Sequence, residues 1–411
     1  MPNRHQTRWV LLVAGGIAAA QGPITCAAAD AANKNVTVQV GERLTHEDNL
    51  YRLPASIEPA DLLGPNARRD DLISSTSAAI AGRWMQGEQE LVLDALIAAH
   101  RFTENDDLDN TSGKGGLDWN WRFGSRWSGK AGGRRERTLA SFANTASLEK
   151  DLFDTASYHG EAQFEVGPRW RATFSARDAA TTHDNDARRD DDIETRSGAF
   201  GLEYHTPRSN SLGWEYRRAR ATFPFAIAVS GAGSASDYEE RGTSLRLNYV
   251  LSEKVLFRGS AGYLERSYPS AGAGGGDFSG DVWTAALQWS PTGKTRIALQ
   301  RWRELKAHLD AESDHFVSTG GGFVAAWSPI DQIDISLQLT REDQRYIGIA
   351  ADALVEPARH DTPRARSLRL TYAPRDRVSF DLSYRLETRD SNRVRFDYDA
   401  ASLSLAGDVK F

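Results

Sequence analysis

The C-terminal segment of the chain alternates strictly between apolar and polar residues and stops at an aromatic residue. Apolar residues occupy one face and polar residues the other in an extended strand: Leu403, Leu405, Val409 and Phe411 against Ser402, Ser404, Asp408 and Lys410. A strand of this kind typically closes a bacterial outer-membrane β-barrel, with one face toward lipid and the other toward an aqueous interior. Because a soluble edge strand can alternate in the same way, the hypothesis requires the pattern to recur along the chain.

The same alternation with a period of two recurs through the rest of the sequence. It is clear in residues 117–123, 170–177, 244–251, 333–340 and 378–387. A period of two indicates strands, since helices repeat every 3.6 residues.

Short and long connections also alternate. We predict tight turns at residues 86–87, 124–125, 167–168, 207–210, 252–254, 291–293, 329–332 and 374–377. Longer polar loops are predicted near 49–68, 103–112, 140–153, 178–192, 224–237, 268–277, 306–314, 346–362 and 388–396. The sequence therefore predicts an all-β, antiparallel transmembrane barrel of about eighteen strands, with short periplasmic turns and long extracellular loops.

A large soluble β-sandwich or β-helix is the alternative fold. Aromatic residues, however, gather near the predicted tight turns: Trp84, Trp127, Trp170, Tyr204, Trp214, Tyr249, Trp289, Trp327 and Tyr372. Aromatic rings at one end of the strands are typical of a membrane interface, and a sandwich gives no reason for them.

The N-terminus predicts export from the cytoplasm. Arg4 and Arg8 precede a short apolar stretch, and Ala27-Ala28-Ala29 offers a cleavage site before Asp30. We expect residues 1–29 to be a cleaved signal peptide and residues 30–411 to form a single barrel domain in the outer membrane of a Gram-negative cell. A retained anchor is the alternative, although the apolar stretch is short for a membrane-spanning helix.

Charge and cysteine content exclude several functions for the mature chain. Loss of the two arginines changes the formal net charge from −6 to −8, which argues against a nucleic-acid partner. The one cysteine, Cys26, leaves with the signal peptide, so disulfides and thiolate chemistry are not expected.

An eighteen-stranded barrel encloses an aqueous lumen. Lysine or arginine at the lipid midplane costs about 2–4 kcal/mol, so the charged faces are expected to point inward. The charged residues predicted to face the lumen are Arg122, Arg171, Arg217, Arg246, Arg385, Asp118, Glu165, Glu215, Asp334 and Asp381. They either contact a polar solute or brace the wall as cross-strand ion pairs.

No motif predicts a cofactor, a metal or catalysis. The nine histidines are scattered without metal-ligand spacing, and the acidic runs at 104–107 and 184–194 lack the spacing of a calcium loop. No short sequence motif indicates the Ser-His-acid set of a barrel hydrolase. We predict that the protein is not an enzyme.

The first long connection opens with Glu47-Asp48-Asn49-Leu50-Tyr51-Arg52-Leu53-Pro54. This octet resembles the D-D-N-L-[FY]-R-L-P signature of the EpsL-type, or putative beta-barrel porin 2, family, with Glu47 in place of the first aspartate. The family consists of outer-membrane proteins from exopolysaccharide biosynthesis loci. The resemblance implies a role in assembly or export of a secreted polysaccharide, with the polymer and its export machinery as partners. A general diffusion porin for small polar solutes is the main alternative, and a barrel hydrolase is a third.

The octet is also unusual as a loop. Leu50, Tyr51 and Leu53 are costly to leave in water, at about 1.5–3 kcal/mol for each full-sized apolar side chain. We expect Asp48 and Asn49 to cap a turn, Pro54 to stop strand pairing, and Arg52 to pair with an inward carboxylate. The segment is then either a constriction at the extracellular end or a packed turn that braces the rim. At the other terminus, we expect Phe411 to direct insertion into membrane lipid by the barrel assembly machinery.

Overall fold

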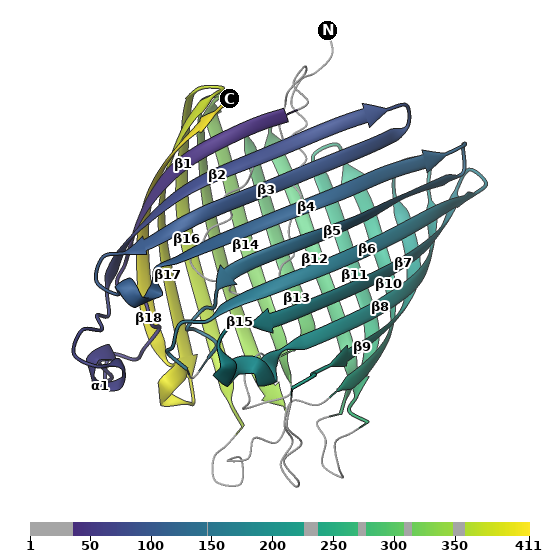
Figure 1. Cartoon of the computed structure of the whole chain (residues 1–411). Coiled ribbons are helices and arrows are strands. Elements are labelled where there is room, and N and C mark those ends of the chain that lie inside the picture. Colours follow the sequence, from purple (N-terminus) through teal and green to yellow (C-terminus); the bar gives the residue numbers. More distant parts are fainter. Residues whose placement is uncertain (1–35, 146, 226–236, 270–276, 308–314, 348–357) are drawn as a thin grey trace.

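The protein is a closed antiparallel barrel of eighteen strands (Figure 1). The computed structural model describes residues 36–145, 147–225, 237–269, 277–307, 315–347 and 358–411. Each strand pairs with its neighbours in the chain, and β1 pairs with β18 to close the barrel. The predicted fold class and strand number are confirmed. The predicted signal peptide, residues 1–29, lies outside the described residues.

The strands have similar lengths. They are β1 (Val36–Glu47), β2 (Asp71–Gln86), β3 (Gln89–Phe102), β4 (Asn110–Phe123), β5 (Trp127–Leu139), β6 (Leu152–Val166), β7 (Trp170–His183), β8 (Ile193–His205), β9 (Ser211–Thr222), β10 (Tyr238–Ser252), β11 (Val255–Ser267), β12 (Phe278–Thr292), β13 (Thr295–Ala307), β14 (His315–Ile330), β15 (Ile333–Ile347), β16 (His360–Arg375), β17 (Val378–Ser391) and β18 (Tyr398–Lys410). Short helices lie in the loops: α1 (Pro59–Leu63), η1 (Asp106–Leu108), η2 (Asp186–Asp191) and η3 (Val394–Phe396). Among the described residues, no helix is long and apolar enough to cross a membrane.

The eight predicted tight turns all join the strands as expected, and they lie at the same end of the barrel as the C-terminus (Figure 1). Gly87, Gly124 and Gly167 adopt φ values of 60°, 61° and 74° in three of these turns. Positive φ is a conformation that glycine adopts without the steric cost of a Cβ atom. The turns therefore depend on these glycines for tight reversal.

Polar and apolar residues divide between the two faces of the wall as the alternation predicts. Leu403 and Leu405 are exposed on the outer surface, whereas Ser402 and Ser404 are buried on the inward-facing side. The strand register keeps polar and apolar residues on separate faces where β18 pairs with β1, since Leu405 faces Leu44 of β1 and Ser404 faces Thr45. The outer wall is thus apolar where it meets lipid.

Aromatic rings form a girdle at the turn end of the outer wall. Trp127 packs on Phe164 with ring centroids 4.7 Å apart, and Trp170 packs on Tyr204 at 5.1 Å. Each pair joins neighbouring strands, and such rings favour the level of the lipid headgroups.

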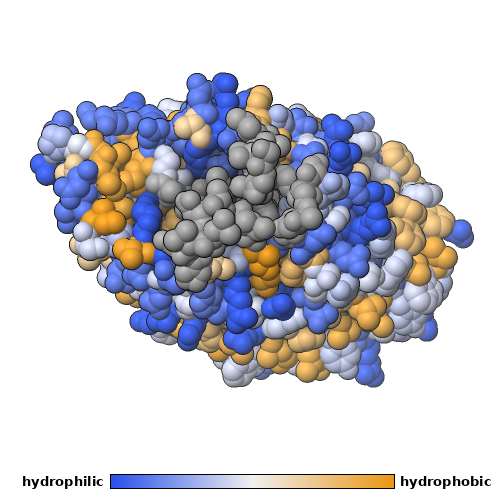
Figure 2. Space-filling view, turned by 90° about the horizontal axis from the view of Figure 1, so that it is seen from below, coloured by the Kyte–Doolittle hydropathy of each residue, from blue (hydrophilic) through white to orange (hydrophobic). Residues whose placement is uncertain are grey.

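Several strands extend farther toward the loop end than predicted. Residues 178–183 belong to β7 and residues 388–391 to β17, although both were predicted as loop. Neither end shows the alternation of a half-buried strand. Residues 178–183 read Asp-Ala-Ala-Thr-Thr-His, and in 388–391 Arg389 faces inward while Asp390 faces outward. Seen from the loop end, hydrophilic residues surround much of the mouth (Figure 2).

Candidate functional site at the extracellular mouth

The octet forms a tight reversal directly after β1. The side-chain oxygen of Asn49 accepts from the backbone N–H of Leu53 at 3.0 Å, and its Nδ2 donates to the Leu53 carbonyl at 2.8 Å. Arg52 has a positive φ of 54°, an uncommon conformation for a residue with a Cβ. Asp48 does not cap the turn as expected. Its carboxylate accepts from the backbone N–H of Ala401 at 2.6 Å, because β1 continues its alignment with β18 at this point.

Arg52 holds the octet against the inward-facing wall. Its Nη1 donates to Glu47 of β1 at 2.9 Å, and its Nε donates to Glu387 of β17 at 3.1 Å. The arginine is 6% exposed. Burial lowers the pKa of Arg52, but the attraction of Glu47 and Glu387 outweighs this effect and raises the pKa above its usual value. The guanidinium is therefore a permanent, paired charge that joins two parts of the wall.

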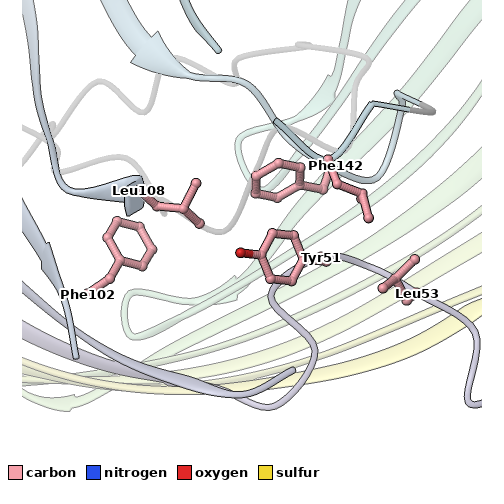
Figure 3. Close-up of a cluster of buried hydrophobic side chains, with 6 residues drawn as sticks. Tyr51, Leu53, Phe102, Leu108 and Phe142 are labelled. Atoms are coloured by element: carbon pink, nitrogen blue, oxygen red, sulfur yellow. The ribbon is translucent and has the colours of Figure 1, made fainter. Parts of the chain in front are cut away.

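The apolar octet residues pack in a small hydrophobic cluster (Figure 3). Its buried members are Tyr51, Leu53, Phe102, Leu108, Phe142 and Leu148. The Tyr51 ring lies 4.9 Å from that of Phe142, and its hydroxyl donates to Asn105 Oδ1 at 3.1 Å. Burial raises the pKa of Tyr51 to about 12, so the hydroxyl stays protonated at neutral pH.

The cluster includes residues from the loop between β5 and β6, residues 140–151. From this loop, Ala143 packs against the inward-facing Tyr398 and Ala400 of β18. Arg389 of β17 donates to the carbonyl of Ala143 and, at 2.9 Å, to Asn144 Oδ1. The loop thus leaves the wall at β5 and β6 and reaches the inner surface of β17 and β18.

Arg395, just before β18, joins the two segments. Its Nη1 donates to the carbonyl of Arg52 at 3.3 Å and its Nη2 to that of Thr145 at 3.1 Å. Residues 48–54 and the described residues of 140–151, which are all but residue 146, therefore form one unit, which we call the mouth assembly. It lies inside the extracellular end along the arc from β17 to β5.

The contribution of residues 140–151 was not predicted, since this segment was treated as an ordinary polar loop. Phe142 and Leu148 are the signal that could have identified it. Apolar side chains in a connection require burial, which was the argument applied to Leu50, Tyr51 and Leu53.

The structure places all ten charged residues predicted for the lumen at inward-facing positions: Arg122, Arg171, Arg217, Arg246, Arg385, Asp118, Glu165, Glu215, Asp334 and Asp381. Most have partners across or along the strands. Arg171 pairs with Glu165 at 2.8 Å, Arg246 with Glu215, and Asp118 with His159 at 3.1 Å. Arg217 forms no ion pair with any residue that the structure describes. Contact with a solute stays a prediction, and so does the alternative that these charges only brace the wall.

The chemistry of the described residues gives no support for metal binding. Within the described ranges, no group of three or more His, Cys, Asp and Glu side chains could hold a metal ion. Among the described residues, His100 lies within hydrogen-bond distance of two serines, at 2.8 Å from Ser75 and 2.7 Å from Ser112. A second serine thus occupies the place that a carboxylate or amide takes in a hydrolase triad.

The sequence matches a known family over its C-terminal part. Residues 233–411 match the family model described as putative beta-barrel porin 2. The chain is a porin-like outer-membrane β-barrel. Because the octet at 47–54 lies outside the matched range, this match is independent of the residues that carried the resemblance in the sequence analysis.

The porin-like barrel is also similar to solved outer-membrane proteins. OccK2 (OpdF) of Pseudomonas aeruginosa is 12% identical with a TM-score of 0.49, and the match covers 92% of this chain and 98% of that one. OpdK of the same species is 11% identical with a TM-score of 0.46, covering 92% and 99%. A BenF-like porin of Pseudomonas fluorescens Pf-5 is 10% identical with a TM-score of 0.48, covering 92% and 99%. Among curated proteins, none matches the sequence.

Proposed function

We propose that this porin-like barrel is a passive channel for polar solutes, narrowed at its extracellular mouth by residues 48–54 and 140–151. The observation that carries the proposal is the chemistry of the inner wall. Arginine and carboxylate side chains both line the inner wall of an eighteen-stranded barrel, a size that leaves room for water. A mixed-charge, hydrated passage suits neutral or zwitterionic polar solutes, because neither sign of charge dominates the wall.

The mouth assembly supplies the selectivity in this proposal. Arg52 is fixed by Glu47 and Glu387, so the octet is held in place on both sides of the β18–β1 closure. A preformed constriction excludes large solutes without a conformational change. Its apolar cluster is internal, so solute meets the polar edge of the assembly.

A secreted polysaccharide is the second candidate solute. The specific support is the octet, which resembles the signature of outer-membrane proteins from exopolysaccharide loci. In this version the barrel takes part in exopolysaccharide biosynthesis or export together with an export machinery, and it performs no catalysis itself.

Two measurements separate these candidates. The first is the swelling rate of liposomes containing the purified barrel, in neutral sugars of increasing size. The second is secreted polysaccharide in a strain that lacks the gene and in the complemented strain. Small-sugar uptake with unchanged polysaccharide supports the diffusion channel. Loss and recovery of polysaccharide supports the export role. If the barrel passes no sugar in liposomes and the strain that lacks the gene secretes a normal amount of polysaccharide, both candidates are contradicted.

The route to the membrane is part of the proposal. Removal of residues 1–29 would leave Asp30 as the first residue, and Phe411 would present the C-terminal strand to the assembly machinery. N-terminal sequencing of protein from isolated outer membranes tests the cleavage site. A first residue at or near Met1 contradicts it.

A further inference from the structure

The outer wall changes from apolar to charged toward the loop end. On β15 the outward-facing residues run Ile335, Leu337 and Leu339, and then Arg341, Asp343 and Arg345. Around much of the barrel these outer charges pair with each other. Three examples are Arg135 with Asp154 at 2.7 Å, Arg196 with Asp178 at 2.9 Å and Arg218 with Glu239 at 2.9 Å.

On β13–β16 the outer charges form a row of arginines instead. Arg301 of β13 faces Gly321 of β14, which faces Arg341 of β15, which faces Arg364 of β16. Arg366 lies one outward position nearer the turns, opposite Leu339. Arg364 pairs with Asp390 at 2.9 Å. Arg301, Arg341 and Arg366, which we call the outer arginine row, are exposed and form no ion pair with any described residue.

Gly321 leaves the surface of β14 open between these arginines. A Cβ at this position would lie 2.8 Å from Cδ and 3.0 Å from Nη1 of Arg301. The Arg301 side chain therefore lies across the bare backbone of Gly321, toward β15 and Arg341. No side chain of β14 separates the two arginines at this level.

Such an arrangement is unfavourable without an anion. Arg341 and Arg364 are like charges at opposing positions on neighbouring strands, which destabilises a sheet, and cations near lipid tails lose hydration. An arginine guanidinium binds phosphate through paired N–H donors, which offsets both effects. Directly on the turn side of the row, the outer wall is apolar and exposed at Leu299, Leu339 and Leu368.

We propose that the outer arginine row binds the phosphate headgroup of a lipid in the outer leaflet of the membrane. The arginines would hold the phosphate, and the apolar wall beside them would contact the acyl chains. The adjacent apolar surface favours a lipid over free phosphate. This site lies on the outer wall, so it is independent of the proposed channel function.

The test measures binding of bisphosphorylated lipid A to the detergent-solubilised full barrel by native mass spectrometry. The variant is R301Q/R341Q/R366Q. The control R135Q/R196Q/R218Q removes the same charge from arginines of the outer wall that are already paired. We expect wild type and control to retain the lipid, and the row variant to bind about tenfold or more weakly, since basic side chains at a membrane surface attract anionic headgroups and this variant removes three of them. Heat-modifiable migration in gels verifies folding of each protein.

Three results would overturn the proposal: equal binding of dephosphorylated lipid A, equal weakening in both triple variants, or inorganic phosphate binding as tightly as the lipid. If the triple variant does not fold, Gly321→Asp provides the second test. It keeps every arginine but places a carboxylate in the row, so lipid retention should fall. Unchanged retention in this folded variant contradicts the proposed site.

Discussion

Arg389 of β17 donates a hydrogen bond to the carbonyl of Ala143, which lies 246 residues earlier in the chain. This contact joins the loop after β5 to the opposite end of the β17–β5 arc. With the Arg52 contacts to Glu47 and Glu387, it fixes the mouth assembly to strands from both ends of the sequence.

Arg389→Gln should destabilise the barrel. Arg389 is almost fully buried, and its loss removes a charged donor from Ala143, from Asn144 and from the nearby Asp361. We expect a loss of about 2 kcal/mol or more in the free energy of unfolding, measured by urea titration in micelles. The control is R135Q on the exposed outer wall, where loss of an ion pair costs about 1 kcal/mol or less. Equal losses in the two variants contradict the assignment.

Phe142→Ala should weaken the hydrophobic cluster. The ring is buried against Tyr51, and a buried Phe→Ala change typically costs about 3–5 kcal/mol. The same titration measures it. Phe225→Ala, in an exposed loop position, is expected to change stability by less than about 0.5 kcal/mol. A Phe142 variant as stable as the Phe225 variant would show that residues 140–151 do not anchor the mouth.

The assignment of faces predicts opposite results at adjacent exposed residues of β15. Leu337→Arg places a charge on the lipid face and should cost about 2–4 kcal/mol, seen as reduced folding into lipid vesicles. Gln338→Arg points into the lumen and should fold with near wild-type yield while shifting ion selectivity toward anions. Similar yields for the two variants are incompatible with the proposed orientation of the wall.

Phe411→Ala should impair assembly in cells more than folding in vitro. The Phe411 backbone N–H donates to the Val38 carbonyl at 2.8 Å, and the substitution keeps this hydrogen bond. It removes only the aromatic ring, which is exposed. We expect less folded barrel in isolated outer membranes but normal refolding of purified protein. Lys410→Ala is the control. Equal amounts of Phe411 variant and wild type in the membrane argue against recognition of the terminal ring.

Local patterns explain why the barrel could be predicted from sequence. Alternation such as that of residues 402–411 depends only on neighbouring positions, and the glycine turns at 87, 124 and 167 are equally local. The predicted strand ends were wrong where charged residues occupy both faces, as at 388–391. There the outer wall has left the apolar band, and the alternation that identifies a strand disappears.

Contacts that depend on register could not be predicted. The contact of Asp48 with Ala401 requires the alignment of β1 with β18, and the outer arginine row requires that of β13–β16. No local pattern relates Arg301 to Arg341. The sequence predicted that Arg52 pairs with an inward carboxylate but not which one. The identity of its partners, Glu47 and Glu387, follows only from closure of the barrel.

Single-channel conductance of the Tyr51→Ala/Arg52→Ala variant in planar bilayers tests the central claim most directly. These substitutions remove the cluster contact with Phe142 and both carboxylate contacts of Arg52. The control Arg171→Ala removes a lumen arginine paired with Glu165, away from the mouth assembly. If residues 48–54 and 140–151 form a constriction, the folded double variant conducts more than wild type and more than the control. Unchanged conductance together with lower stability would mean that the octet only braces the rim.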